Sequence, residues 1–422
     1  MITIGKSCIE ENGELAFLRA PVEVSPDTAR EYARRVAALT NAGWLVHEDY
    51  PPRSWSNGGG ELWFFVPAEF GRYLCTERSN AYVVAMLWYA LVAGSDIAFE
   101  APLSKRLYDG IVHRLMPELQ GNGFAPIQLI GPITSESVVC AGGVATGMSG
   151  GVDSLYTLHC YGSDDAPSGM RLTHLTYYMG NYRYPLRPDG RDSQTLFRIE
   201  EGRAVPIIEN ARRKAHNAGL PFILTNSNLD ADYYRGGLIY TAMYRNAAYS
   251  LALEYLHGAY ISSSSGHAHE VYEASLFSLT QHYEDLLCDC LRTETFRYTS
   301  SDQATRVEKL RVLADDKGAQ QFVAVCYAPS DDGRNCGECY GCWKTMIPLD
   351  LLGKLDLFSE TFDVPQYQRN RARVFEDFIR FSLRPEASSA RESVRQILAL
   401  AESDPSEPGD LFVQTYRIVM EK

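Results

Sequence analysis

The octapeptide GMSGGVDS, Gly147 to Ser154, combines residue types that serve two unrelated kinds of chemistry. Its first five letters fit the G-x-S-x-G turn of serine hydrolases, in which Ser149 is the nucleophile. Its last six letters, SGGVDS, have the small residues and hydroxyls of a loop that binds phosphate groups. Both interpretations need a strand before the serine and a helix after it, so the rest of the chain has to distinguish them.

We predict a strand-to-helix turn at this octapeptide. The apolar run Val144 to Met148 indicates a strand, and we expect a helix to begin in Asp153 to Tyr161. Gly150 and Gly151 let the backbone approach an anion closely, because they have no side chain. Their amide groups then point outward at the positive end of the helix dipole, where phosphate binds well.

The polar side chains of the octapeptide complete such a site. Ser149 and Ser154 add hydroxyl donors, and Asp153 can hold a Mg²⁺ ion that offsets the phosphate charge. No G-K-[ST] follows the turn and no lysine occurs between Ala141 and Cys160, so this is not a Walker A loop. A γ-phosphoryl transferase would need that lysine. An enzyme that catalyses attack on the α-phosphate of ATP and expels pyrophosphate does not need it.

Four of the ten cysteines fall within the short segment CYAPSDDGRNCGECYGC. Thiolates two residues apart on tight turns can point at one ion, and four sulfurs with no open position are typical of a structural, tetrahedral zinc site. A C-x2-C-x2-C run also occurs in iron-sulfur proteins, so a cluster of that kind stays open as the alternative. The predicted metal ligands are Cys326, Cys336, Cys339 and Cys342.

The SGGVDS motif resembles the signature of the N-type ATP pyrophosphatases, or PP-loop enzymes, which adenylate a carboxyl or carbonyl oxygen before a nucleophile displaces AMP. With the cysteine array downstream, it resembles 7-cyano-7-deazaguanine synthase over roughly residues 140 to 345. The resemblance implies a carbon-nitrogen ligase that converts 7-carboxy-7-deazaguanine, ATP and ammonia through an adenylate and an amide into a nitrile. It also implies a zinc ion on the four cysteines.

The same resemblance and the strand positions suggest further site residues. The segment YRNAAYSLALEY is similar to an R-N segment near the nucleotide in that family, so we expect Arg245 to neutralise a phosphate. The backbone at Tyr178 to Gly180, at the end of the next strand, is expected to contact adenine. The expected catalytic residues are Ser149, Asp153, Ser154 and Arg245. The expected ATP-binding residues are Met148, Ser149, Gly150, Gly151, Val152, Asp153, Ser154, Tyr178, Met179 and Gly180.

The chain departs from that family in two respects. The segment SSSSGHAHEVY, Ser262 to Tyr272, replaces the substrate-binding segment, so base-recognition residues cannot be transferred. The chain is also extended at both ends, as in synthase-like proteins of bacterial antiviral defence operons. There the resemblance implies a partner protein amine as the alternative acceptor to ammonia, with the amino-terminal region as its docking surface.

The elements around these motifs predict an α/β fold with a parallel sheet, and the resemblance implies that its core is a PP-loop core of the adenine nucleotide alpha hydrolase type. From Val138 onward, short apolar strands followed by helices indicate βα units. We expect an amino-terminal α/β domain at residues 1–135, the PP-loop domain at 136–345 and a helical extension at 346–422. The predicted core strands are Val138 to Cys140, Val144 to Met148, Leu172 to Tyr178, Phe222 to Thr225 and Ala259 to Ser262.

Composition narrows the class of protein. The formal charge of -13 argues against passive nucleic-acid binding, which needs a basic surface. The amino terminus lacks the pattern of a secretory signal, so we expect a cytoplasmic protein whose cysteines stay reduced. The apolar run Ala81 to Ala93 is too short to cross a bilayer and predicts a buried helix.

Three other functions remain open. A hydrolase would use Ser149 with one of the downstream histidines His267, His269 and His282, but it leaves Asp153 and the cysteines without a role. A tRNA-thiolating PP-loop enzyme fits the motif, although no RNA-binding module is recognisable. A non-catalytic nucleotide-binding scaffold has no need of the intact SGGVDS residues.

Overall fold

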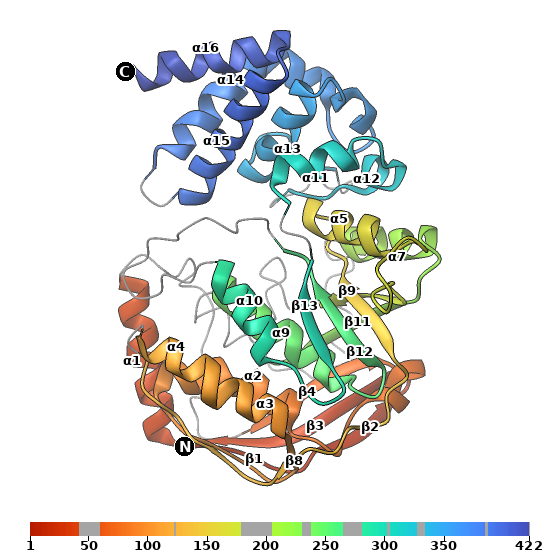
Figure 1. Cartoon of the computed structure of the whole chain (residues 1–422), viewed down its shortest axis with the longest axis vertical. Coiled ribbons are helices and arrows are strands. Elements are labelled where there is room, and N and C mark those ends of the chain that lie inside the picture. The colour runs from red at the N-terminus through yellow and green to blue at the C-terminus, as the bar shows by residue number, and fades with distance from the viewer. Residues whose placement is uncertain are drawn as a thin grey trace.

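The chain folds around one large β-sheet in an α/β arrangement (Figure 1). The structure is a computed structural model that describes residues 1–41, 60–121, 124–178, 205–229, 238–264, 281–301, 304–326, 334–384 and 387–421. Within these ranges the sheet has the order β13-β12-β9-β10-β11-β4-β3-β1-β5-β7, with β2 also paired to β3. Pairing is parallel from β13 to β11, antiparallel from β11 to β1 and parallel again from β1 to β7. The strands of this sheet are β1 (Ile2–Ile4), β2 (Cys8–Asn12), β3 (Leu15–Val24), β4 (Gly60–Pro67), β5 (Ile97–Phe99), β7 (Leu129–Ile130), β9 (Gly143–Gly147), β10 (His174–Tyr178), β11 (Phe222–Ser227), β12 (His257–Ser262) and β13 (Arg297–Ser300).

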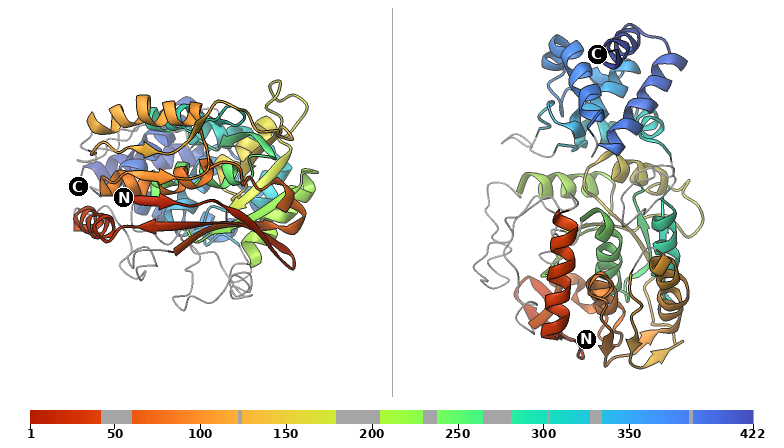
Figure 2. Two further views of the ribbon diagram at one scale, coloured as in Figure 1. Left: turned by 90° about the horizontal axis from the view of Figure 1, so that it is seen from below. Right: turned by 90° about the vertical axis from the view of Figure 1, so that its left-hand side faces the viewer.

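Helices cover both faces of the sheet, and a carboxyl-terminal group of helices lies beyond its edge (Figures 1 and 2). Helices α2 and α9 pack against each other on one face, whereas α5 and α7 lie on the other. The second face shares its hydrophobic core with helices α11 to α16. The helices are α1 (Pro26–Asn41), α2 (Asn80–Ala93), α3 (Lys105–Gly110), α4 (Met116–Gly121), α5 (Val152–Tyr161), α7 (Val205–Asn217), α9 (Leu238–Ala252), α10 (Gln281–Cys290), α11 (Arg306–Leu313), α12 (Lys317–Phe322), α13 (Tyr340–Leu351), α14 (Val364–Ser382), α15 (Ser388–Ser403) and α16 (Glu407–Met420).

Strand β3 shows how the sheet is buried on both faces. Ala16 and Leu18 belong to the core beneath α2 and α9, whereas Leu15 and Phe17 belong to the core beneath α5 and α7. Alternate residues of a strand point to opposite faces, so one strand contributes to both cores. A strand covered in this way has a continuous apolar sequence instead of an alternating one.

The α/β class predicted from the sequence is confirmed. The buried helix predicted at Ala81 to Ala93 is α2, in which every residue is buried. Among the described residues, none of the helices has both the length and the apolarity needed to cross a membrane.

The strand predicted at Val138 to Cys140 is wrong, because these residues form no regular element. The backbone of Val138 pairs with a side chain instead of a strand: its N–H donates to Thr295 Oγ1, and the same hydroxyl donates to its carbonyl. The side chain of the neighbouring Val139 is apolar but 92% exposed, so it does not indicate a buried strand. The four other predicted core strands are present, with their ends shifted by a few residues.

The strands of residues 1–135 and of residues 136–345 belong to the same sheet. Strand β4 joins them by antiparallel pairing with β11, where Phe65 faces Asn226 and Phe64 faces Ser227. The division into three domains stays a prediction, but any boundary near residue 135 separates strands that are hydrogen-bonded to one another.

Candidate functional site

The octapeptide forms the predicted strand-to-helix turn at the carboxyl end of strand β9. Strand β9 ends at Gly147 and helix α5 begins at Val152, between the parallel neighbours β10 and β12. Gly150 has φ +81°, a left-handed conformation that glycine adopts without strain. The turn therefore lies at the carboxyl end of a central parallel strand, the usual ligand side of such sheets.

The two serine hydroxyls hold the turn in shape. Ser149 Oγ accepts the N–H of Gly151 at 3.2 Å and lies 3.3 Å from Ser154 Oγ. Ser154 Oγ donates to the Gly151 carbonyl at 2.9 Å. Ser149 is exposed, whereas Ser154 is buried, so the first hydroxyl is accessible to a ligand and the second is a support. The histidines of the hydrolase interpretation, His267 and His269, lie outside the described residues, as does the side chain of His282.

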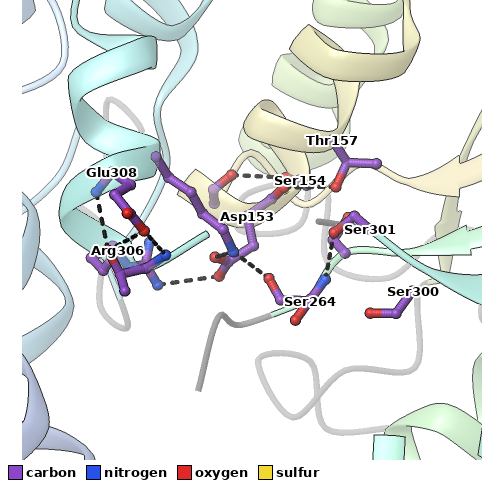
Figure 3. A network of polar contacts seen from close by, with 12 residues as sticks. Asp153, Ser154, Thr157, Ser264, Ser300, Ser301, Arg306 and Glu308 are labelled. Atoms are coloured by element: carbon purple, nitrogen blue, oxygen red, sulfur yellow. Dashed lines mark hydrogen bonds and ion pairs between the residues drawn. The ribbon is translucent and has the colours of Figure 1, made fainter. Parts of the chain in front are cut away.

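Asp153, in the first turn of α5, binds two cations from α11 (Figure 3). Its Oδ1 accepts from Lys309 Nζ at 2.8 Å and its Oδ2 accepts from an Arg306 guanidinium nitrogen at 3.1 Å. Burial by itself raises the pKa of Asp153, but the charges of Arg306 and Lys309 outweigh it and lower the pKa to about 2. The carboxylate is therefore ionised at every physiological pH.

Lys309 connects three parts of the site. Its side chain is 0% exposed, and its Nζ donates to the Ser264 carbonyl as well as to Asp153. Ser264 follows β12, and its N–H donates to the hydroxyl of Ser301, which follows β13. A capping box between Thr305 and Glu308 fixes the start of α11, so the two basic side chains have a rigid base (Figure 3).

Arg245 and Tyr178 lie in a second group, around α9. Arg245 is on α9 and is 8% exposed; burial raises the pKa of Tyr178 and of Tyr260, and the charge of Arg245 opposes that rise. Tyr178 stacks on Tyr249 at 4.4 Å between centroids, and its hydroxyl lies 3.1 Å from Ser250 Oγ. Burial raises the pKa of Tyr178 to about 12, against the opposing effect of these neighbours.

The remaining predicted nucleotide-binding residues divide into two groups. Met148 and Val152 are buried in the core beneath the turn, so their backbone is the part available to a ligand. Met179 and Gly180 lie outside the described residues. The replaced substrate segment is described only as far as Ser264.

The four predicted metal ligands come together in one cluster before and at the start of α13. The Sγ atoms of Cys326, Cys336, Cys339 and Cys342 all lie within 4.8 Å of one another. Separations of 3.5, 3.8 and 3.9 Å join Cys339 to Cys342, Cys336 to Cys342 and Cys339 to Cys326. Four sulfurs about 2.3 Å from a tetrahedral zinc ion are about 3.8 Å apart, so the donor set fits zinc. A disulfide requires about 2 Å, which excludes one here.

A hydrogen-bonded segment connects the cysteine cluster to the glycine-rich turn. Asn335 Oδ1 accepts the N–H groups of Val325 and Cys326, and its Nδ2 donates to the Val323 carbonyl. One residue away, the N–H of Ala324 donates to the Gly150 carbonyl at 2.8 Å. The segment that carries the first predicted metal ligand, Cys326, thus also contacts the glycine-rich turn.

Sequence reasoning missed the basic residues of the site. Lys309 and Arg306 lie on α11, far from the octapeptide along the chain, and a third basic residue, Lys214, reaches the turn from α7. No local motif indicates these residues. The available signal was weak: a helical, mostly polar segment that contains a lysine and an arginine at an i, i+3 spacing.

Comparisons of the chain with known proteins identify no family. No protein-family model matches the chain, and no curated protein or solved structure matches it either. The residues of the turn, the basic side chains around it and the four-cysteine cluster are therefore the basis for any assignment.

Proposed function

We propose that the protein is an ATP-dependent adenylating enzyme that activates a carboxylate and releases pyrophosphate in the cytoplasm. The observation that carries this proposal is the glycine-rich turn with buried cations on neighbouring elements. The positive end of α5, the Gly150 and Gly151 amides and the Ser149 hydroxyl would supply hydrogen-bond donors where a polyphosphate would lie; the Gly151 N–H would exchange its 3.2 Å bond to Ser149 Oγ for one to a phosphate oxygen. Preorganised donors of this kind stabilise the charge that builds up on leaving pyrophosphate.

The proposed reaction has two steps. A carboxylate oxygen bonds to the α-phosphorus of ATP while the bond from that phosphorus to the bridging oxygen breaks, and the electron pair leaves with pyrophosphate. An unprotonated amine then attacks the acyl carbon, the bond to AMP breaks and the amine proton passes to solvent. The product is an amide.

Asp153 is the residue that would hold Mg²⁺, and this ion would offset phosphate charge. Both of its oxygens accept from Arg306 and Lys309. A carboxylate oxygen has further acceptor capacity, so it can also contact a metal. Arg306 and Lys309 give the site fixed positive charge and orient the Asp153 carboxylate. Arg245, on α9, is in our proposal a phosphate or substrate ligand on the other face of the sheet.

The four cysteines would hold zinc with no part in the chemistry. Four thiolates leave no open position, and their segment supports the turn through Ala324 and Gly150. Their retention as ligands fits a reducing compartment.

For the substrate, we propose 7-carboxy-7-deazaguanine or a related carboxylate. The motif resemblance supports this choice, and the longer chain supports an amine on a partner protein as acceptor in antiphage defence. Neither suggestion is needed for the adenylation step itself.

The test is pyrophosphate release from ATP with a panel of carboxylates, including carboxy-deazaguanine. We expect release with one of them, and loss of release in Gly150→Ala, because a Cβ there meets both a positive φ and neighbouring atoms. Gly353→Ala is the matched control, since Gly353 has φ +66° with open space around it. Release only with tRNA would support a thiolating enzyme, and no release with any carboxylate would support a scaffold.

A further inference from the structure

Lys214 is a buried lysine that lies directly against the glycine-rich turn. It belongs to α7 and is 3% exposed. A Cβ built on Gly150 would collide with its Nζ and would also lie 3.1 Å from Ala324 Cβ. The ammonium group is therefore beside the backbone of the turn, on the side where the segment after α12 meets it.

This ammonium group has no hydrogen-bond partner among the described residues. The nearest aromatic ring, Phe322, has its centroid 5.9 Å from Nζ, and it offers neither a lone pair nor a counter-charge. Buried lysines are normally paired, because a desolvated ammonium without an acceptor is unfavourable. Among the residues that the structure describes, this arrangement lacks an anionic or acceptor group.

Within the described ranges, no carboxylate supplies that group. The charged or titratable residues on α7, α12 and α5 are few, and one carboxylate, Glu209, lies on α7 itself. The others are Arg212, Arg213 and His216 on α7, Asp316 and Lys317 at α12, and Asp153 and His159 on α5. None of them shifts the pKa of Lys214, which burial alone lowers to about 7. Asp153 already accepts from two cations of α11. The turn itself presents amides and the positive end of a helix, so it too requires an anion.

We propose that Lys214 is a ligand of the pyrophosphate that leaves ATP, and that α7 thereby supplies the ammonium which the loop sequence lacks. In a Walker A loop the lysine follows the glycines within the same segment. Here Lys214 is more than sixty residues away in sequence but adjoins Gly150 in space. The inference rests on the proposed function for the identity of the anion.

Binding of such an anion favours the protonated lysine. A phosphate oxygen provides both the acceptor and the counter-charge that Nζ lacks, so the pKa of Lys214 rises in the complex. At pH 8 the protein therefore takes up part of a proton as the anion binds. This proton uptake is a signal that a purely structural lysine does not produce.

The experiment measures binding of inorganic pyrophosphate with Mg²⁺ to the full-length, zinc-loaded protein by calorimetry at pH 8, in two buffers of different ionisation enthalpy. In Lys214→Met we expect affinity at least about tenfold weaker and no proton uptake. Arg213→Met is the matched control, because Arg213 lies on the same helix and over the same ring, at 5.3 Å, but is exposed. That variant should bind within about twofold of the unmodified protein, as expected for an exposed charge.

The outcomes separate this inference from the proposed function. Lys214→Met binding as tightly as the unmodified protein, or no binding of pyrophosphate by the unmodified protein, overturns the role of Lys214. If either of these binding results is obtained but the protein still releases pyrophosphate from ATP, the role of Lys214 is wrong and the adenylation proposal is retained. Lys214-dependent binding without release from any carboxylate supports the anion site and contradicts the enzyme. Methionine keeps the length of the side chain and removes an unpaired charge, so a thermal melt should show a folded variant.

Discussion

The two sides of the glycine-rich turn hold buried lysines in opposite states. On the α11 side, Lys309 is fully buried and donates to Asp153 and to the Ser264 carbonyl. On the α7 side, Lys214 is equally buried but has no acceptor among the described residues. A buried charge with partners is part of the framework, whereas one without partners is available for a ligand. The comparison assigns stability to the α11 side and binding to the α7 side.

The largest expected effect concerns the four-cysteine cluster, whose segment contacts the turn through Ala324 and Gly150. Cys342→Ser should abolish stoichiometric zinc, about one ion per chain, and lower the free energy of unfolding by at least about 4 kcal/mol, because structural zinc binding is coupled to folding. Metal analysis and urea denaturation measure the two changes. Cys290→Ser, at a buried cysteine outside the cluster, should keep its metal. Undiminished zinc in Cys342→Ser would contradict a role for Cys342 as a zinc ligand, and iron with visible absorption would favour an iron-sulfur cluster.

The next effect tests the framework role of the α11 side. Lys309→Met removes one of the two cationic partners of Asp153 and leaves the Ser264 carbonyl without the Lys309 donor. The free energy of unfolding should therefore fall by about 3 kcal/mol. The matched control is Lys354→Met, because Lys354 pairs with Asp315 at an exposed position and should cost less than about 1 kcal/mol. Equal stability of the two variants would remove the distinction between the lysines.

The smallest effect is a pH dependence that comes from Asp153. Its folded pKa of about 2 lies below the usual value of 3.8, so the ion pair stabilises the fold above about pH 4. That stabilisation, about 2 kcal/mol, is lost as the pH falls from 4 to 2. Subtracting the unfolding curve of Asp153→Asn from that of the unmodified protein isolates it. A difference that stays constant over this range would mean that Asp153 is not held by α11.

The sequence predicts the parts of the site that are local. Glycines between an apolar run and a helix start specify the turn at Gly150, and the spacing of the four cysteines specifies their cluster, because neighbours along the chain determine both. Lys309 and Lys214 could not be found in this way. Each reaches the turn through the packing of a distant helix, and tertiary packing leaves no periodic signal at a single lysine.

In the fold, too, the local features were predictable from the sequence and the long-range pairing was not. Strands β9 to β12 are predicted because an apolar run bounded by polar residues is a local pattern. The pairing of β4 with β11 was not predicted, since any antiparallel partner satisfies the same backbone groups. Val138 to Cys140 shows the opposite error: this apolar triplet forms no strand, since the backbone of Val138 bonds to a threonine hydroxyl and Val139 is exposed.

The continuous sheet has a practical consequence for anyone who divides this chain. A fragment that begins near residue 136 would leave the backbone groups of β11 next to Asn226 and Ser227 without their partners on β4. It would also uncover the core that Phe17 and Phe65 complete. Open strand edges beside exposed aromatic surface promote association between copies. Such a fragment should aggregate, whereas the intact chain covers that edge with its own amino-terminal strands.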